Sequence, residues 1–155
     1  MCWLCDHPAS TRQNYLDVLG AEVRRNGWAV QYVQDSRTPF AYTVGLHDWD
    51  RPELMVTGVS AARAARLLNA MAAESLRTAA PPPGSRLRVP GGPLAEFVEV
   101  DHPDAHLCWA VKFARSDIRA LQMVWADGHG RWPWSASFCD GRRRQPVLGL
   151  RAPAA

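Results

Sequence analysis

The fold of this chain is decided by the stretch WAVQYVQDSRTPFAYTVGLHDWDRPELMVTGV, residues 28–59. Apolar side chains recur at every second position in residues 28–32 and again in residues 40–44, as in strands with one buried face. A third apolar run occupies residues 54–58, and turn-forming residues separate the runs. The connection between the second and third runs is short and has no helical pattern, so the sequence predicts an antiparallel hairpin there.

Residues on either side of this stretch predict helices and further strands. Ser10 and Gln13 have the spacing of a capping box, and Gly27 is suited to end that helix in a left-handed conformation. Ser60 is a suitable N-cap for a second, alanine-rich helix, and Pro103 suits the first turn of a third. Further strands are predicted at residues 87–89, 94–100 and 120–125.

These elements predict an α+β fold, with a mostly antiparallel sheet of about five or six strands and about three helices packed on it. The alternation of helices and strands leaves room for a parallel pair. The length of 155 residues is typical of a single domain, in which residues 1–9 form an N-terminal Cys-x-x-Cys segment and residues 140–155 a basic C-terminal tail. No apolar run is long enough to span a membrane and no secretory signal is visible, so a cytoplasmic protein is expected.

Positive charge is concentrated near the C-terminus. The chain has a net charge of +3, and from Arg131 onward five arginines stand against one aspartate. Arg142, Arg143 and Arg144 are consecutive and form a basic turn. Guanidinium groups bind phosphate oxygens through paired hydrogen bonds, so this turn is a candidate for weak, sequence-independent contact with RNA. The alternative is a solvated loop without a partner.

The first seven residues contain Cys2, Cys5 and His7. A Cys-x-x-Cys turn brings two thiolates onto one tetrahedral ion and His7 adds a nitrogen ligand, so the spacing predicts a zinc site. A closed structural site needs about four ligands, so another must come from elsewhere in the chain. Candidates for that ligand are His47, His102, His106, Cys108, His129 and Cys139. The alternatives are a reversible Cys2–Cys5 redox pair and an N-terminal tail with two incidental thiols.

Trp132 and Trp134 flank Pro133 and predict a rigid aromatic ledge. Aromatic side chains supply a large contact area at low entropic cost, so the ledge can seat a ligand or a protein partner. The alternative is that the two rings only cover the edge of the sheet.

An enzyme reading depends on His47, Glu53 and Asp127, which lie at predicted strand ends or in the adjoining loops. A histidine–carboxylate pair can act as a general base or orient a metal-bound water. The chain has no glycine-rich phosphate loop, nucleophile elbow or HExxH motif. The alternative is that the acidic residues of this region are turn residues or pair with nearby arginines.

Six motifs occur in a recognisable order: W-x-V-x-x-V at residues 28–33, PFAYTVGL at 39–46, PELMVTG at 52–58, LQMVWAD at 121–127, WPW at 132–134 and QPVLG at 145–149. Together they resemble the bacterial family labelled domain of unknown function 4262. That label carries no established reaction, so the resemblance implies no catalytic residue. The MCWLC start resembles an actinobacterial subgroup, which implies zinc-responsive control of ribosome hibernation by a small factor that helps a hibernation protein reach the ribosome. Cys2 and Cys5 are the residues that carry this link.

We therefore expect a small zinc-binding or zinc-responsive adaptor that acts through a protein or ribosome partner. In this hypothesis the N-terminal cysteines hold zinc, and the aromatic ledge and the basic turn meet the partner. The first alternative is a metal-dependent, hydrolase-like enzyme that uses His47 with Glu53 or Asp127. The second alternative is a redox sensor based on Cys2 and Cys5.

Overall fold

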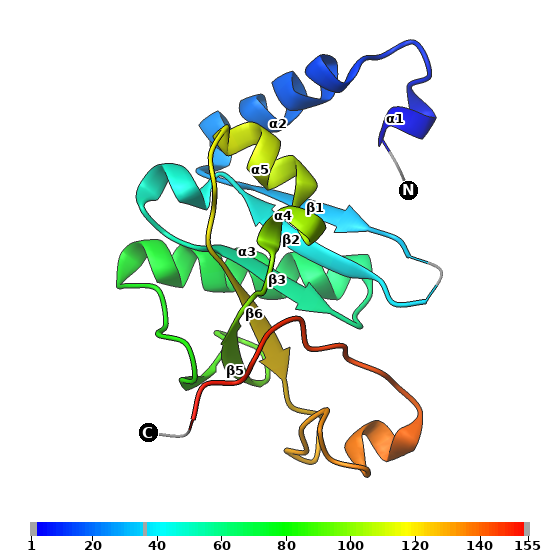
Figure 1. The fold of residues 1–155 in the computed structure, drawn as a ribbon, viewed down its shortest axis with the longest axis vertical. Helices are drawn as coiled ribbons and strands as arrows, with labels where there is room; N and C mark the ends of the chain where they lie inside the picture. The colour runs from blue at the N-terminus through cyan, green and yellow to red at the C-terminus, as the bar shows by residue number, and fades with distance from the viewer. Residues whose placement is uncertain (1–2, 36, 154–155) are drawn as a thin grey trace.

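The computed structural model describes residues 3–35 and 37–153, which form a six-stranded mixed sheet with helices on both faces (Figure 1). The strand order is β1-β2-β3-β6-β5-β4. The strands are β1 (Ala29–Val33), β2 (Phe40–Val44), β3 (Glu53–Thr57), β4 (Arg86–Arg88), β5 (Leu94–Glu99) and β6 (Ala120–Trp125). The helices are α1 (Trp3–Asp6), α2 (Arg12–Asn26), α3 (Ala61–Arg77), α4 (Pro103–His106) and α5 (Cys108–Ala114), with 3-10 turns η1 (Leu46–Trp49) and η2 (Phe138–Gly141).

The expected α+β class and the mostly antiparallel sheet are confirmed. β1, β2 and β3 form two consecutive antiparallel pairs, as the short connections predict. β3 and β6 are parallel, with Glu53 opposite Ala120. The connection between these two strands contains α3, the β4–β5 hairpin, α4 and α5, which is long enough for the crossover that a parallel pair requires.

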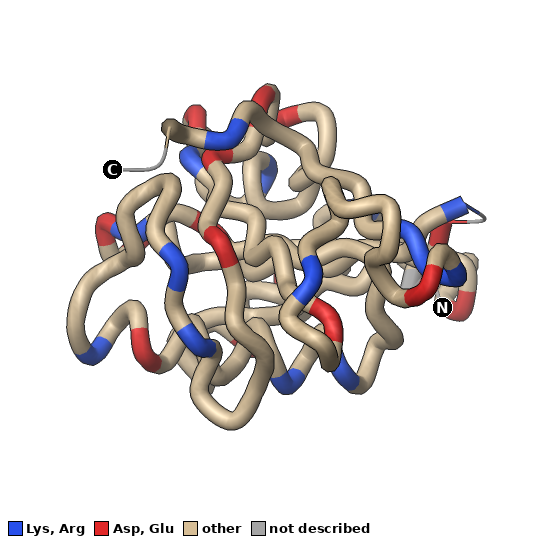
Figure 2. Tube along the Cα trace, turned by 90° about the horizontal axis from the view of Figure 1, so that it is seen from below, with Lys and Arg blue, Asp and Glu red and all other residues tan. Residues whose placement is uncertain are grey.

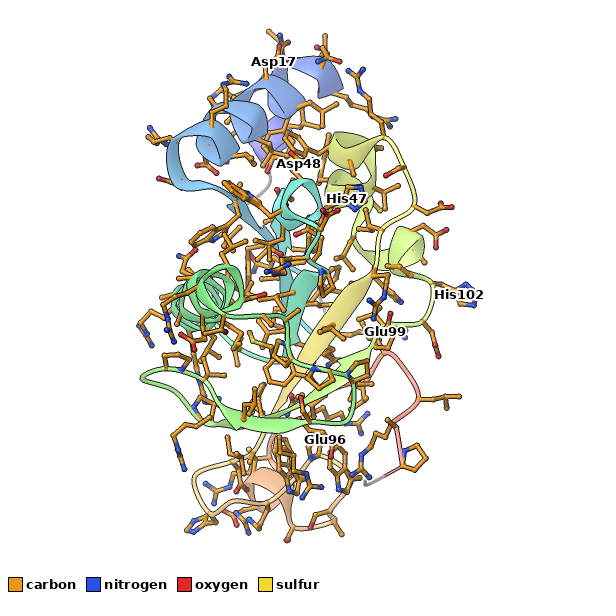
Figure 3. The ribbon with its side chains drawn as sticks, turned by 90° about the vertical axis from the view of Figure 1, so that its left-hand side faces the viewer. Asp17, His47, Asp48, Glu96, Glu99 and His102 are labelled. Atoms are coloured by element: carbon orange, nitrogen blue, oxygen red, sulfur yellow. The ribbon has the colours of Figure 1, made fainter. Side chains whose placement is uncertain are left out.

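The alternation of side chains along the central strands divides the core into two layers. Leu54 and Val56 of β3 pack in one cluster with the apolar face of α3, whereas Met55 between them packs in the other cluster with α2 and α5. Figure 3 shows α3 on one side of the sheet and α5 on the other. The sheet is therefore covered on both faces, which explains why every residue of β3 and β6 is buried.

The helix ends follow the predicted chemistry with one shift. The capping box of α2 is formed by Thr11 and Asn14, so the prediction of Ser10 and Gln13 is wrong by one residue. The side-chain oxygen of Asn14 accepts a hydrogen bond from the Thr11 amide at 2.7 Å. The capping-box spacing in the sequence predicts the corresponding bond for Gln13. Gly27 ends α2 with a left-handed φ of 92°, as expected. No helix of the described residues is long and apolar enough to cross a membrane.

A C-terminal segment, residues 145–149, is held against the sheet by two buried glutamine side chains. The Gln145 side chain pairs with the backbone of Trp125, accepting from its N–H and donating to its carbonyl, both at 2.8 Å. The side chain of Gln122 donates to the Pro146 carbonyl at 2.7 Å and accepts from the Leu148 amide at 2.8 Å. These bonds take the place of strand pairing on the side of β6 where its pairs with β3 end, at Gln122.

Two glycines, Gly58 and Gly149, allow this part of the chain to lie close to neighbouring backbone. Gly149 lies against the carbonyl oxygen of Glu99, where an added Cβ would collide with backbone. Gly58 has a left-handed φ of 74°, and an added Cβ would lie 2.7 Å from the carbonyl oxygen of Arg144. A glycine is therefore required at both positions, and the chain before the C-terminal segment passes directly over the β3–α3 connection.

We predict that Gln145→Ala lowers the free energy of unfolding by about 2 kcal/mol, because each of its two buried hydrogen bonds contributes about 1 kcal/mol. Leu150→Ala is the matched control, since Leu150 is 84% exposed and adjoins the same segment. Its effect should stay within about 0.5 kcal/mol. Urea denaturation followed by circular dichroism measures both variants, and equal stability of the two would contradict the proposed role of Gln145.

Candidate functional site

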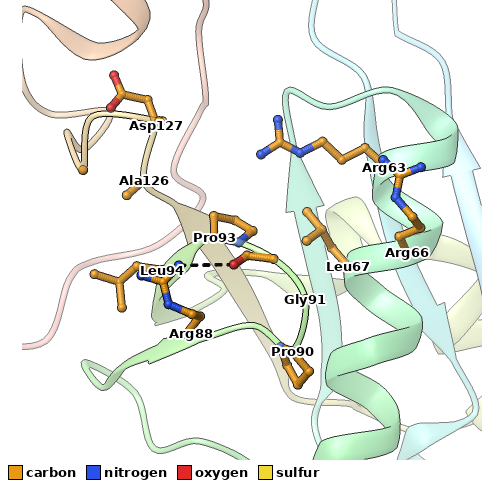
Figure 4. Close-up of a pocket in the computed structure, with 13 residues that line it drawn as sticks. Arg63, Arg66, Leu67, Arg88, Pro90, Gly91, Pro93, Leu94, Ala126 and Asp127 are labelled. Atoms are coloured by element: carbon orange, nitrogen blue, oxygen red, sulfur yellow. Dashed lines mark hydrogen bonds between the residues drawn. The ribbon is translucent and has the colours of Figure 1, made fainter.

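One end of the molecule, which we call the basic end, has six arginine side chains that lack an acidic partner among the described residues: Arg63, Arg66, Arg88, Arg142, Arg143 and Arg144. It consists of the β4–β5 turn, the first turns of α3 and the loops that follow β6; these loops lie at the bottom of Figure 1, and α3 crosses its middle. A cavity of about 700 Å³ opens here between α3, the β4–β5 turn and the loop after β6. Arg63 and Arg66 of α3 line it on one side and Arg88 of β4 on the other (Figure 4). We call this cavity the arginine groove.

One arginine of the groove, Arg63, is held in place by an aromatic ring. The Arg63 guanidinium lies over the buried ring of Trp125, 4.9 Å from the ring centroid. The Trp125 ring is itself held by a 3.0 Å hydrogen bond from Nε1 to the carbonyl of Thr57. Figure 4 shows the Arg63 side chain extending from α3 across the gap toward the loop that carries Asp127. A guanidinium stacked in this way loses little further freedom when it binds an anion.

The carboxylate beside the groove is already neutralised. Asp127 accepts hydrogen bonds from the backbone amides of His129, Arg131 and Cys139 and from the Arg131 side chain, and its own side chain is 4% exposed. Burial disfavours its charged form, but the three amides and the Arg131 guanidinium outweigh that effect and lower the pKa of Asp127. Asp127 therefore shapes its own loop and pairs with Arg131, which also binds Asp140, and not with an arginine of the groove.

The predicted aromatic ledge exists as a stack of two indole rings, which we call the tryptophan stack. Trp132 and Trp134 lie 5.3 Å apart at an interplanar angle of 6°. Arg86 covers the Trp132 ring at 4.7 Å and Arg151 covers the Trp134 ring at 3.5 Å. Both guanidiniums bind the buried carboxylate of Glu96, and the hydrogen bond from Arg151 lowers its pKa. Trp134 is nevertheless 41% exposed, so part of its side chain is within reach of a partner.

The basic turn of Arg142, Arg143 and Arg144 follows η2 and is exposed at all three positions. Within residues 3–35 and 37–153, no carboxylate lies within ion-pair distance of these three side chains. η2 precedes the turn and Gln145 follows it, so both of its ends are anchored. Figure 2 looks at the molecule from this end and shows basic and acidic positions interspersed along its loops.

The opposite end of the central strands contains a fully buried carboxyl group, that of Glu53, the first residue of β3. Thr43 donates its hydroxyl proton to this group at 2.6 Å, and the backbone amides of Gly45 and His47 donate at 2.9 and 3.2 Å. Burial raises the pKa of Glu53 to about 7, although these donors favour the ionised form. Gly45 has a φ of 105° and abuts Val23, so the tight turn around the carboxyl group depends on a residue without Cβ.

His47 and Glu53 are neighbours, but not as a catalytic pair. The carboxyl group contacts the His47 backbone, whereas the imidazole Nε2 lies 3.1 Å from Ser116 Oγ in the α5–β6 loop. Asp127 follows the far end of β6, which runs parallel to the strand that Glu53 begins. The structure therefore does not bring Asp127 to His47, and Glu53 has no solvent-accessible surface on which to meet a substrate.

The predicted zinc ligands are described only in part. Cys2 lies outside the described residues, while Cys5 and His7 are both exposed in and after α1. The described part of the chain contains no group of three histidine, cysteine, aspartate or glutamate side chains that could hold a metal ion. Cys5 and His7 supply suitable donors, and a closed site needs Cys2 and a further ligand in addition.

The two candidates preferred for the remaining ligand lie elsewhere in the fold. Cys139 packs with the core cluster beneath α3, whereas Leu4, beside Cys5, packs with the other cluster. Figure 1 shows α1 and the 138–141 turn toward opposite ends of the long axis. His47 contacts Ser116 through its ring, and Cys139 lies away from α1.

Sequence reasoning missed the arginine groove. Arg63 and Arg66 are three apart on α3, and this spacing only marks the polar face of that helix. Arg88 stands in an exposed edge strand that is distant in sequence. No local signal joins these residues, because the order of β4, β5 and β6 in the sheet brings them together.

Comparison with known proteins gives a family match. The model of the family described as "Domain of unknown function (DUF4262)" matches residues 22–139. That range contains the whole sheet, the arginine groove and the tryptophan stack, and leaves out the N-terminal cysteines and the basic turn. No curated protein and no solved structure matches the chain.

We predict that Glu53→Gln removes a pH dependence of stability. The pKa of Glu53 is about 7 in the folded protein and about 4.3 in an unfolded chain. Between these values the native state holds a proton that the unfolded state has lost, so wild-type stability falls as the pH rises, by on the order of 3 kcal/mol. Urea titrations from pH 4 to 8 measure this change in the free energy of unfolding. Asp48→Asn, an exposed change on the same turn, should keep the fall, and a fall that persists in Glu53→Gln would exclude this assignment.

Proposed function

The chain belongs to the DUF4262 family, and we propose that it is a zinc-responsive adaptor that attaches through its basic end to a ribosome-bound partner. The family description assigns no reaction. The observation that carries the proposal is the separation of the two candidate segments. The Cys5–His7 segment and the basic turn lie toward opposite ends of the long axis, and each is exposed (Figure 1). One end is available for sensing and the other for attachment.

The basic turn is suited to a phosphate backbone. Its three guanidiniums carry uncompensated charge, and anchoring at both ends lowers the entropy that the loop loses on binding. Contacts of this kind attach a protein to RNA without reading its sequence. The tryptophan stack beside it adds rigid ring edges, of which Trp134 is 41% exposed. Together these features favour a ribonucleoprotein surface over a small substrate.

The zinc response is assigned to Cys2, Cys5 and His7. Zinc bound there would fix the N-terminal segment in one conformation, because a structural zinc site contributes folding energy directly. The MCWLC start resembles the actinobacterial subgroup linked with zinc-responsive ribosome hibernation. We therefore propose that zinc occupancy controls whether the adaptor is competent to bring a hibernation factor to the ribosome.

We predict that replacing Arg142, Arg143 and Arg144 with alanine weakens binding to purified ribosomes at least tenfold. Each lost phosphate contact should also lower the slope of log affinity against log salt by about 1. The matched control replaces three exposed arginines of α2 with alanine, namely Arg12, Arg24 and Arg25. This control removes the same amount of charge. Sedimentation of ribosomes at several salt concentrations measures both variants. Equal losses in the two variants would mean that net charge, and not the basic turn, governs attachment.

We predict about one zinc ion per chain by elemental analysis. The double variant Cys2→Ser with Cys5→Ser should lose the metal, and the single variants Cys108→Ser and Cys139→Ser show whether either thiol is the further ligand. Ribosome sedimentation from zinc-replete and chelator-treated samples should differ for the wild type and not for the first variant. Unchanged zinc content in that first variant would remove the zinc assignment, whatever the result for the basic turn.

A further inference from the structure

Neither the adaptor role nor the family description uses the arginine groove. Three cationic side chains line this concave surface, and none of them has a carboxylate within ion-pair distance among the residues that the structure describes. Asp127, at the rim, is saturated by its own loop. Like charges that share a cavity repel one another unless an anion joins them. The groove is therefore complementary to a ligand with several negative charges.

The geometry of the cations suits phosphoryl groups. Arg63 is held over Trp125 at the base of the groove, and Arg88 approaches from the opposite wall with a 3.4 Å contact to the Gly92 carbonyl (Figure 4). Arg66 is one turn further along α3 and is exposed. Planar guanidiniums bind phosphate oxygens through two parallel hydrogen bonds, so cations on both walls can clamp a chain of phosphates between them.

The rest of the lining restricts the size and kind of ligand. A volume of about 700 Å³ lies within the range of small-molecule sites, roughly 300–1,000 Å³. The uncharged walls are aliphatic and prolyl, from Leu67, Leu94 and residues 90–93. Proteins that hold single-stranded RNA stack its bases on exposed aromatic rings, and Trp125 beneath the groove is only 2% exposed and covered by Arg63. A small phosphorylated molecule fits this lining better than a nucleic-acid strand.

From these observations we infer that the arginine groove binds the di- or triphosphate group of a small ligand, with its phosphates between Arg63, Arg66 and Arg88. The shared chemistry belongs to nucleoside polyphosphates and to inorganic polyphosphates alike. The aliphatic walls provide room for the nucleoside of the former. This binding is independent of the attachment of the basic turn to RNA, because different arginines are used.

The test is isothermal titration calorimetry of the full chain with ATP, GTP, inorganic tripolyphosphate and AMP, without divalent cations. We expect saturable binding of the triphosphates, at least tenfold tighter than AMP. Tighter binding of ATP or GTP than of tripolyphosphate would assign the aliphatic walls to the nucleoside. Equal binding would assign the site to the phosphate chain alone, and both results support the inference.

Variants decide whether the groove is the site. Arg66→Glu with Arg88→Glu changes two exposed side chains and leaves the Arg63–Trp125 contact in place, so the fold should persist, which circular dichroism and urea denaturation verify. This variant should bind triphosphates at least tenfold more weakly. Replacement of Arg142, Arg143 and Arg144 with alanine should leave triphosphate binding unchanged. Absence of saturable binding to the wild type, unchanged binding in the groove variant, or an equal loss in the basic-turn variant would each overturn the inference.

Discussion

Two buried glutamine side chains, Gln122 and Gln145, fix the basic end of this protein. The pairing of β6 with β3 ends at Gln122, and the side-chain amide of Gln145 pairs with the backbone of Trp125 further along β6. Unpaired backbone groups at this buried position would cost free energy, so the pairing determines the path of the chain on both sides of Gln145. That path carries the basic turn over the β3–α3 connection and brings Arg151 onto the tryptophan stack.

Acidic side chains are held by local partners at both ends of the central strands. At the end where β3 begins, the Glu53 carboxyl is enclosed and its hydrogen-bonding capacity is used by a hydroxyl and by backbone amides, so it organises a turn. At the basic end, the acidic side chains of Asp127 and Glu96 are likewise consumed by local partners. Three groove arginines and three turn arginines are left without acidic partners among the described residues. Guanidiniums without acidic partners are available to bind anions.

Sequence reasoning succeeded where an element depends on its own residues. Ser60 caps α3 because its hydroxyl accepts from an amide three residues on, and Gly27 ends α2 because only glycine adopts that conformation cheaply. The aromatic ledge also formed, because Trp132 and Trp134 are separated only by proline. Arg86 and Arg151, from remote segments, lie over these rings, and no sequence pattern predicted those contacts.

The sequence by itself determined the strands, the principal helices, the α+β class and the position of the basic turn. These follow from side-chain periodicity and capping, which act over a few residues. The tertiary structure alone decided that Asp127 lies at the opposite end of the central strands from His47. It also decided that Arg88 and Arg63 line the same cavity. Both depend on the parallel pairing of β3 with β6 and on the placement of the β4–β5 hairpin beside it. Long-range pairing is set by the packing of the whole core, and no local pattern encodes it.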